Sequence, residues 1–286
     1  MSQKIWLDGE LVNEENAKIS VFDHGLLYGD GVFEGIRVYS GKIFREEDHL
    51  IRFFDCAKFI RLDIGYTTEE VGKAMRDTVA ANGITNGYIR LVATRGAGTL
   101  GLNPFLCPKS SMFVIAAGVK LYSDELYQDG LRVVSSSIMR NPTNCVPPQV
   151  KSLNYLNNIL AKIEALDNGV LEAIMYNSQG YVTEATGDNV FIVKNGVLYS
   201  PPVSAGSLSG ITRKVVIELA EKAQIKFIER NLTRYNLYTA DEIFLTGTAA
   251  EVIGVVCMDG RTIGTGKPGP MTVKLKDMFH NYAHSC

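Results

Sequence analysis

The stretch that decides the fold is Val150-Lys151-Ser152-Leu153-Asn154-Tyr155-Leu156-Asn157-Asn158. Apolar residues continue beyond it at helical spacing, so the pattern predicts a helix over 152–167 with Gly169 as its C-cap. Lys151 would lie at the start of this helix, with Tyr155 one turn further on and close enough to share a site. An amine attacks a carbonyl only after losing its proton, which partial burial or a nearby cation favours. Lys151 is therefore the first candidate catalytic residue.

Other motifs add groups that bind a charged ligand. Glu184 lies just past a turn, among small polar residues. The segment Ser209-Gly210-Ile211-Thr212 precedes apolar residues at helical spacing, which predicts a helix N-terminus whose free N–H groups attract an anion. The segment Thr246-Gly247-Thr248-Ala249-Ala250-Glu251 ends a predicted strand with small side chains, which expose backbone N–H groups. Arg52 interrupts the apolar face of a helix predicted over 45–62, as a partner for phosphate would.

Each of these motifs also has a purely structural interpretation. Lys151 could be an ordinary exposed lysine, Glu184 a solvated strand carboxylate, and Arg52 a surface arginine whose stem packs on the core. Ser209 could be a plain N-cap, and the segment from Thr246 a strand-end turn. Taken together, however, the motifs supply an amine for an aldehyde, an acid for a ring nitrogen and N–H groups for a phosphate. Those are the groups that pyridoxal phosphate needs.

Composition limits the class of protein. The chain has 286 residues, of which 46% are hydrophobic, and a net charge of −2; this predicts a large core in two modest domains or one large one. No basic block is present and no apolar run is long enough to cross a membrane, so neither nucleic acid nor a membrane is an expected partner. Five cysteines without close pairs, and no visible secretory signal, predict reduced thiols and a cytoplasmic location. The four histidines lack ligand spacing, so we expect no metal site.

The segment Gly96–Gly101 matches the G-x-G-x-x-G pattern of dinucleotide-binding proteins after a predicted strand. That interpretation requires a helix to open at the third glycine. Pro104 follows too soon for such a helix. We therefore interpret 96–103 as a loop that borders a pocket.

The predicted order of elements mixes hairpins with single helices. Hairpins are expected at 4–12 and 32–44, and helices at 45–62, 68–82, 152–167, 211–223 and 270–283; strands are expected at 88–94, 112–117, 131–138, 171–176, 181–184, 189–194, 226–230, 242–246 and 252–257. This order predicts a mixed α/β (α+β) fold rather than a doubly wound parallel sheet. Weak patterning around 119–129 suggests a linker between an N-terminal domain, 1–118, and a C-terminal domain, 130–286.

Nearly the whole chain, from about Ile5 to Val273, resembles the class IV aminotransferases, which use pyridoxal phosphate. The block Asp23-His24-Gly25-Leu26-Leu27-Tyr28-Gly29-Asp30-Gly31-Val32-Phe33-Glu34-Gly35-Ile36-Arg37 resembles the N-terminal signature of the branched-chain group, and so does His49-Leu50-Ile51-Arg52. The resemblance implies the two-domain fold type IV, with a small α/β domain and a larger pseudo-barrel α/β domain. It also implies at least a homodimer.

The resemblance assigns roles by position. Lys151 would bind the cofactor's aldehyde and later carry the proton, Glu184 would bind the pyridine nitrogen, and Tyr155 would hydrogen-bond the phenolic oxygen. The other cofactor-binding positions would be Arg52, Leu208, Gly210, Ile211, Thr212 and Thr248. Substrate would be bound by Tyr28, Phe33, Gly35, Arg37, Tyr88, Arg90, Thr248 and Ala249, with Arg90 meeting glutamate's distal carboxylate.

The expected activity is transamination between L-glutamate or 2-oxoglutarate and branched-chain L-amino acids or their 2-oxo acids, as in branched-chain amino acid biosynthesis. A D-amino-acid aminotransferase, an aminodeoxychorismate lyase and an amine transaminase remain alternatives on the same fold. The arginine and nearby histidine that D-amino-acid enzymes carry at a pocket loop are not found here, and the lyases typically lack the Phe33–Arg37 block. A cofactor-binding module without turnover is a remote alternative.

Overall fold

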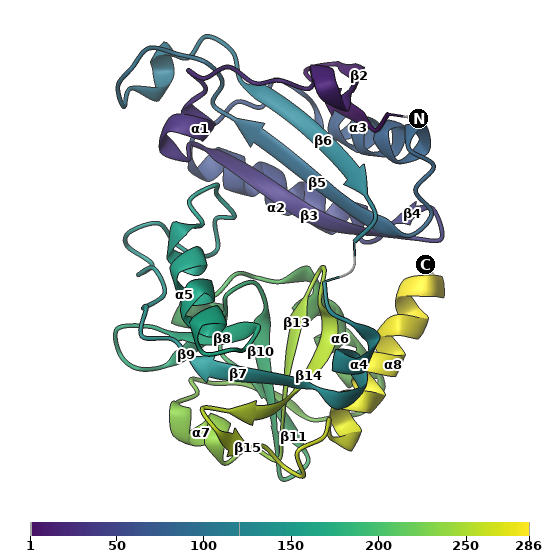
Figure 1. Cartoon of the computed structure of the whole chain (residues 1–286), viewed down its shortest axis with the longest axis vertical. Coiled ribbons are helices and arrows are strands. Elements are labelled where there is room, and N and C mark those ends of the chain that lie inside the picture. Colours follow the sequence, from purple (N-terminus) through teal and green to yellow (C-terminus); the bar gives the residue numbers. More distant parts are fainter. Residues whose placement is uncertain (1, 120, 286) are drawn as a thin grey trace. The chain divides into compact units, whose positions relative to one another are not determined.

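The protein, described by a computed structural model, is built from two compact units (Figure 1). The structure describes residues 2–119 and 121–285. The N-terminal unit comprises residues 2–119 and Val150–Asn154, and the C-terminal unit comprises residues 121–149 and Tyr155–Ser285. The short segment that contains Lys151 therefore packs with residues far earlier in the sequence. Each unit has its own buried apolar core.

A six-stranded antiparallel sheet organises the N-terminal unit, in the order β2-β1-β6-β5-β3-β4. Its strands are β1 (Lys4–Leu7), β2 (Glu10–Asn13), β3 (Gly31–Tyr39), β4 (Lys42–Ile43), β5 (Gly87–Thr94) and β6 (Ser111–Ala117). The hairpins expected at 4–12 and 32–44 are confirmed, and they turn at Asp8-Gly9 and Ser40-Gly41. All four of these turn residues have positive φ, the conformation that fits a two-residue connection between twisted strands.

Helices α2 (Glu46–Phe59) and α3 (Thr68–Ala81) lie on one face of this sheet (Figure 1). Thr67 and Glu70 form a capping box that begins α3, which satisfies two backbone donors that the helix leaves without partners. Because side chains alternate along a strand, Val32 and Ile36 of β3 enter the core beneath the helices. The odd-numbered side chains of β3 point to the opposite face of the sheet.

A mixed nine-stranded sheet organises the C-terminal unit. Its path is β12-β11-β10-β13-β14-β7-β8-β9, with β15 paired to β14. The strands are β7 (Leu131–Ser135), β8 (Glu172–Tyr176), β9 (Val182–Ala185), β10 (Asn189–Lys194), β11 (Val197–Ser200), β12 (Phe227–Glu229), β13 (Glu242–Gly247), β14 (Glu251–Met258) and β15 (Arg261–Thr262). Strand β7 runs parallel to both β14 and β8, whereas β13 is antiparallel to β10 and β14. The predicted mixed α/β class is therefore confirmed.

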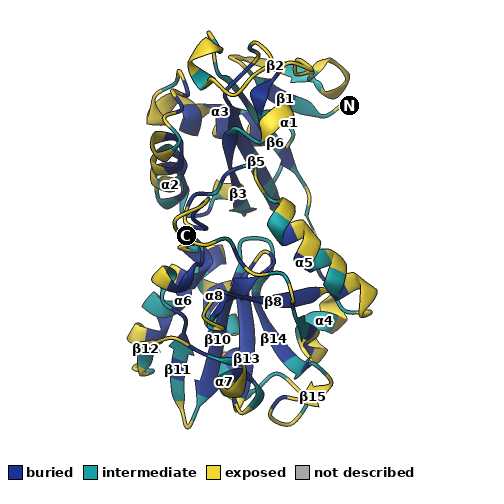
Figure 2. Ribbon diagram, turned by 90° about the vertical axis from the view of Figure 1, so that its left-hand side faces the viewer, coloured by how far each residue is buried: buried dark blue, intermediate teal, exposed yellow. Residues whose placement is uncertain are grey.

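The helices in the described part of the C-terminal unit are α4 (Asp124–Asp129), α5 (Leu156–Asp167), α6 (Ile211–Lys222), α7 (Arg234–Tyr238) and α8 (Pro270–Ser285). The central strands of the sheet are buried, whereas α5 carries many exposed residues (Figure 2). The order of the longer elements agrees with the sequence prediction. Short elements without a long apolar period were missed: α1 (His24–Tyr28), α4, α7, β11 and β15, and the 3-10 turns Glu14–Asn16, Pro104–Leu106 and Val203–Ala205.

Candidate active site

The backbone of Lys151 is fastened to the N-terminal unit on both sides. The N–H of Phe33 donates to the Lys151 carbonyl at 3.0 Å, and Leu153 donates to the carbonyl of Gly31 at 2.9 Å. The N–H of Lys151 donates to the Cys56 Sγ atom at 3.3 Å. The Nζ atom of Lys151 lies 4.6 Å from the centre of the Phe33 ring. The lysine is half-buried. Its main chain is held by hydrogen bonds to Phe33 of β3 and Cys56 of α2.

The prediction that a helix begins at residue 152 is wrong. Helix α5 begins at Leu156, with Tyr155 as its N-cap. The segment Val150–Asn154 instead pairs with β3, through a bridge between Ser152 and Val32, because its backbone groups find strand partners there. Lys151 and Tyr155 consequently do not share a helical turn, and they belong to different units.

Arg52 is held by a buried acid and a buried histidine. Its Nε and one terminal nitrogen donate to the two carboxylate oxygens of Glu34 at 2.7 and 2.8 Å, and Nδ1 of His49 lies 2.7 Å from Glu34 Oε2. Burial alone would raise the pKa of the Glu34 carboxyl, but Arg52 and His49 outweigh it and hold that pKa well below its usual range. Burial lowers the pKa of His49, against the attraction of Glu34. The group therefore contains one carboxylate, one guanidinium and, at neutral pH, one neutral imidazole.

The predicted substrate residues of β3 and β5 share the face of the sheet opposite α2 and α3. Gly35 is paired with Arg90 and Arg37 with Tyr88, and cross-strand partners point to the same side. The Arg90 guanidinium lies 4.6 Å from the Phe33 ring centre and 5.5 Å from that of Tyr88. A Cβ atom at Gly35 would come within 1.9 Å of the Tyr88 hydroxyl, so the tyrosine can take this position only over a glycine.

Tyr28 ends α1 and contacts the loop after β5. Its hydroxyl accepts a hydrogen bond from the N–H of Gly101 at 3.1 Å, and its ring packs edge-on against His24 at 5.0 Å. His24 Nε2 in turn lies 2.9 Å from the carbonyl of Thr99. The prediction that no helix opens at the third glycine is confirmed, since residues 96–103 form a loop attached to α1.

In the C-terminal unit, Glu184 is bound through both carboxylate oxygens. Arg140 Nε donates to Oε1 at 2.7 Å, and the N–H of Leu208 donates to Oε2 at 2.9 Å. The side chains of Glu184 and Arg140 each retain 7% exposure. A carboxylate oxygen has two lone pairs, so Glu184 can accept a further hydrogen bond from a ligand while it remains paired with Arg140.

Helix α6 begins without a side-chain cap. Its N-cap residue is Gly210, and Ile211 and Thr212 open the first turn. A Cβ atom at Gly210 would come within 2.0 Å of Asn189 Oδ1, so the glycine allows Asn189 to sit beside the helix start, where its Nδ2 donates to the Leu208 carbonyl at 2.9 Å. The first N–H groups of a helix have no partner within it. This start therefore offers donors and a positive dipole end to an anion.

Thr248 and Ala249 lie in the tight turn between β13 and β14. The preceding Gly247 leaves room for Asp188, whose Oδ1 would lie 1.8 Å from a Cβ atom at that position. Two buried polar atoms of the same unit, Thr246 Oγ1 and Asn158 Oδ1, have no hydrogen-bond partner within the described residues. Buried polar groups are rarely left in this state, so these two atoms favour a ligand or water beside them.

The structure thus sorts the predicted site residues into two groups. The N-terminal unit contains Lys151, Arg52, Tyr28, Phe33, Gly35, Arg37, Tyr88 and Arg90. The C-terminal unit contains Tyr155, Glu184, Leu208, Gly210, Ile211, Thr212, Thr248 and Ala249. Sequence reasoning missed Arg140 as the partner of Glu184, and Glu34 and His49 as partners of Arg52. No local pattern marks Arg140, whereas Glu34 and His49 were visible in the signature blocks without a role.

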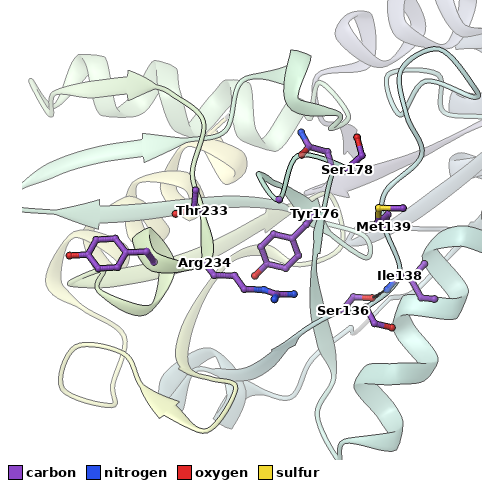
Figure 3. Close-up of a pocket in the computed structure, with 11 residues that line it drawn as sticks. Ser136, Ile138, Met139, Tyr176, Ser178, Thr233 and Arg234 are labelled. Atoms are coloured by element: carbon purple, nitrogen blue, oxygen red, sulfur yellow. Dashed lines mark hydrogen bonds between the residues drawn. The ribbon is translucent and has the colours of Figure 1, made fainter.

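A cavity of about 510 Å³ in the C-terminal unit contains none of these residues. Figure 3 shows the Arg234 side chain extending along the Tyr176 ring, with Ser136 and Ile138 on another wall. The guanidinium lies 4.5 Å from the ring centre. Ser136 already donates to the Glu164 carboxylate and Asn177 to the Ala205 carbonyl, so much of the polar lining is engaged in internal hydrogen bonds.

Three further findings concern the described part of the chain. None of its helices is long and apolar enough to cross a membrane. No group of three or more histidine, cysteine or acidic side chains in residues 2–119 and 121–285 is arranged to hold a metal ion. The cysteines at 56, 107, 145 and 257 are free thiols, and Cys286 lies outside the described residues.

A model of the amino-transferase class IV family matches residues 31–257. The chain belongs to this family, whose fold is the mixed α/β fold type IV of pyridoxal-phosphate enzymes. Among its relatives, a putative branched-chain-amino-acid aminotransferase of Methanocaldococcus jannaschii is 51% identical over 276 residues, which cover 96% of this chain and 95% of the relative. The branched-chain-amino-acid aminotransferase of Escherichia coli K12 is 39% identical, covering 96% of this chain and 91% of the relative.

A solved structure is also similar over the full chain. The T.th. branched-chain amino acid aminotransferase with pyridoxamine 5'-phosphate superimposes with a TM-score of 0.96 at 39% identity, covering 100% of this chain and 95% of the other. The class of protein is thus an aminotransferase, and within that class the branched-chain enzymes resemble this chain over almost its whole length.

The residues present fit pyridoxal phosphate. The uncapped start of α6 suits its phosphate, and the doubly anchored Glu184 suits a protonated ring nitrogen. The unpartnered Thr246 Oγ1 and Asn158 Oδ1 atoms provide polar positions for a bound group. Lys151, with its main chain fixed by hydrogen bonds, is a primary amine of the kind that the cofactor's aldehyde needs. The protein therefore carries the donors, the acid and the amine that this cofactor requires.

Proposed function

We propose that the protein transfers an amino group between L-glutamate or 2-oxoglutarate and branched-chain L-amino acids or their 2-oxo acids. When bound, pyridoxal phosphate supplies an aldehyde for the substrate amine and a ring that accepts electrons. Everything else in the reaction is assigned to residues of the chain.

In this proposal each cofactor contact has a separate physical task. Ile211 and Thr212 bind the phosphate through their N–H groups, Thr248 adds a hydroxyl, and Arg52 adds a guanidinium. Glu184 accepts a hydrogen bond from the ring nitrogen and favours its protonated form, because Arg140 and the Leu208 N–H keep the carboxylate in place. Tyr155 binds the phenolic oxygen, and Leu208 packs against the ring.

The chemical step assigned to Lys151 is proton transfer at the substrate's Cα atom. A positioned base is effective because it needs no diffusional encounter. The hydrogen bonds from Phe33 to the Lys151 carbonyl and from Lys151 to Cys56 fix the main chain of this base. Only the flexible side chain of Lys151 then has to move during the proton transfer.

The observation behind the choice of substrate is the placement of Arg90 over Phe33. One surface thereby offers an apolar ring to a branched aliphatic side chain and a guanidinium to the distal carboxylate of glutamate. Within the described residues Arg90 contacts two aromatic rings and no acidic side chain. Solved structures of the T.th. relative in complex with N-(5'-phosphopyridoxyl)-L-glutamate and with 4-methylvaleric acid support this pairing of substrates.

A spectroscopic and kinetic experiment tests the proposal. The purified protein should show the near-visible absorbance of a cofactor covalently bound to lysine, and should convert L-leucine with 2-oxoglutarate. Lys151→Ala should remove that absorbance and lower kcat by about 10⁴-fold, the upper range for a positioned base. Full turnover by the variant would reject the mechanism.

The rivals on this fold are separated by substrate. A D-alanine aminotransferase of Staphylococcus haemolyticus is 38% identical over 282 residues, so D-alanine belongs in the panel beside L-leucine. Pyruvate release from aminodeoxychorismate would indicate a lyase, and turnover of simple amines an amine transaminase. A bound yellow cofactor without amino transfer to any 2-oxo acid would indicate a non-catalytic module.

We also propose that the protein is a cytoplasmic homodimer or larger homo-oligomer, built from a small N-terminal and a larger cofactor-binding domain. Helix α5 supports assembly, because five apolar side chains at helical spacing are 43% to 65% exposed: Leu156, Ile159, Leu160, Ile163 and Leu166. Such stripes mark protein interfaces. Light scattering should give at least twice the chain mass of 31.4 kDa. A monomer at micromolar concentration would exclude the assembly.

A further inference from the structure

Glu34 and His49 are the least exposed members of the group around Arg52. The side chain of Glu34 is 0% exposed and that of His49 is 1% exposed, whereas Arg52 retains 13%. A ligand from solvent could therefore touch Arg52 but not the other two. Whatever Glu34 and His49 contribute to binding has to pass through the guanidinium.

The group offers little net charge. Glu34 is a carboxylate whose charge offsets that of Arg52, and His49 is neutral. Since the Glu34 oxygens can only accept, the Nδ1 atom of His49 carries the proton and donates. Buried ion pairs of this kind are poor sources of stability, because desolvation of both charges offsets their attraction. A role in fixing one conformation accounts for them better than a role in stabilising the fold.

The geometry is suited to that role. Arg52 forms two parallel hydrogen bonds with Glu34, through Nε and a terminal nitrogen. A planar guanidinium held along this edge cannot rotate, so the direction of its other edge is fixed. His49 in turn prevents rotation of the carboxylate, through its hydrogen bond to Oε2. His49 and Arg52 lie three residues apart on α2, and Glu34 faces them from β3.

We propose that Glu34 and His49 are positioning residues that aim Arg52 at the phosphate of the cofactor. The inference rests on the proposed cofactor role of Arg52 and adds that direction, rather than charge, is what the buried pair contributes. A lysine could not be oriented in this way, because its ammonium group lacks the planar pair of donors that a guanidinium presents to a carboxylate.

The N-terminal unit contains a matched control. Arg95 also forms two parallel bonds with a carboxylate, from Nε and a terminal nitrogen to Asp30, both at 2.9 Å. Two further donors bind the carbonyls of Ile60 and Arg61 at 2.7 and 2.6 Å. Arg95 therefore links the end of α2 to Asp30, the residue that precedes β3. Breaking this pair should reduce stability without changing how phosphate is recognised.

The test compares the apoenzyme's dissociation constants for pyridoxal and for pyridoxal phosphate, measured by absorbance or fluorescence titration. The dissociation constant for pyridoxal divided by that for pyridoxal phosphate isolates the contribution of the phosphate. A lower ratio therefore means weaker recognition of the phosphate. Arg52→Lys and Glu34→Gln should each lower this ratio by about tenfold, the effect of losing one oriented charged hydrogen bond. His49→Ala should lower it by about threefold, and His49→Asn, which keeps a donor near the Nδ1 position, should restore it. Asp30→Asn should leave it unchanged.

The outcomes separate the two claims. If Arg52→Met, which removes the charge, leaves the ratio unchanged, the proposed phosphate role of Arg52 fails, and the inference with it. If Arg52→Met lowers the ratio but Arg52→Lys does not, charge alone suffices and the positioning role is overturned. If Arg52→Lys lowers the ratio but Glu34→Gln does not, the positioning role alone is overturned. If circular dichroism shows that Glu34→Gln does not fold, the same ratio is measured for Glu34→Asp instead. This variant keeps the charge but withdraws the carboxylate by one methylene, so a positioning role still predicts a lower ratio and a purely electrostatic role an unchanged one.

Discussion

In the N-terminal unit the charged candidate Arg52 is already paired, through Glu34 and His49, whereas in the C-terminal unit the start of α6 is an open set of backbone donors beside Gly210. The first arrangement fixes direction and carries little net charge. The second carries the positive end of a helix and needs no side chain. Arg52 thus depends on the direction of a side chain and the start of α6 on a helix dipole and backbone donors, so substitutions near the two should affect different measured constants.

Among the substitutions that contrast the two units, the largest effect is expected from removing the charge of Glu184, the acid of the C-terminal unit. Glu184→Gln keeps the size of the side chain but no longer favours a protonated ring nitrogen, so kcat should fall by about 10² to 10³-fold, as for other lost electrostatic contacts. Steady-state kinetics with L-leucine measures this. The same variant leaves the buried Arg140 guanidinium without its charged partner, and a lower Tm should accompany the loss. Unchanged kcat would remove Glu184 from the site.

A substrate-dependent effect is expected in the N-terminal unit. Arg90→Ala removes the guanidinium from above Phe33, so the KM for L-glutamate should rise by about 10 to 100-fold, the value of a charged hydrogen bond. The KM for L-leucine should change only a few-fold. Measuring both constants in one preparation provides the internal control, and equal changes would contradict the assignment of Arg90.

The open start of α6 can be perturbed through Gly210. A methyl group there would meet Asn189 Oδ1 at 2.0 Å, so Gly210→Ala should push Asn189 away from the helix start and weaken pyridoxal phosphate binding by about tenfold, or roughly 1.4 kcal/mol. Gly187→Ala is the matched control, because nothing lies within 4 Å of a Cβ atom at that glycine. Similar affinities for both variants would show that the space around Gly210 is not used.

The smallest effect concerns how the free energy of unfolding depends on pH. Because the pKa of His49 is lower in the folded state than its ordinary value of 6.5, the unfolded chain binds the extra proton first as the pH falls. The stability contributed by neutral His49 is therefore present above about pH 6.5 and is lost progressively below it. Besides Glu34, the charges that act on His49 are those of Arg52 and Lys151.

His49→Asn should remove this dependence. Between pH 7.5 and 5.5 the original protein should lose up to about 1.4 kcal/mol per pH unit more than the variant. Urea unfolding of the two apoproteins at both pH values measures the difference. Parallel losses would mean that folding does not lower the pKa of His49.

Much of the fold follows from apolar periodicity and turn chemistry, as the Asp8-Gly9 hairpin and the capping box at Thr67 show. The helix predicted from residue 152 failed for a physical reason. Leu153 and its neighbours fit a helical period, but strand β3 offers their backbone groups partners that are distant in sequence. Periodicity records which side chains are apolar and cannot show where a backbone donor will find its acceptor.

The candidate site shows the same limit. Residues proposed to touch a ligand, such as Glu184 and Gly210, lie in motifs with recognisable chemistry. Residues that hold them in place do not, because Arg140 is separated from Glu184 by 44 positions and only the sheet brings them together. The role of Glu34 was hidden for another reason: alternation along β3 places it on the face opposite Phe33, and a sequence motif does not reveal which face is which.

The return of Val150–Asn154 to the N-terminal unit has a consequence for anyone who divides the gene. A fragment that ends near residue 119 would contain Phe33 and Cys56 but not the lysine whose main chain they bind. The complementary fragment would contain the lysine with its docking partners missing. Split proteins and domain exchanges should therefore keep residues 150–154 with the first piece, by circular permutation or by a grafted strand.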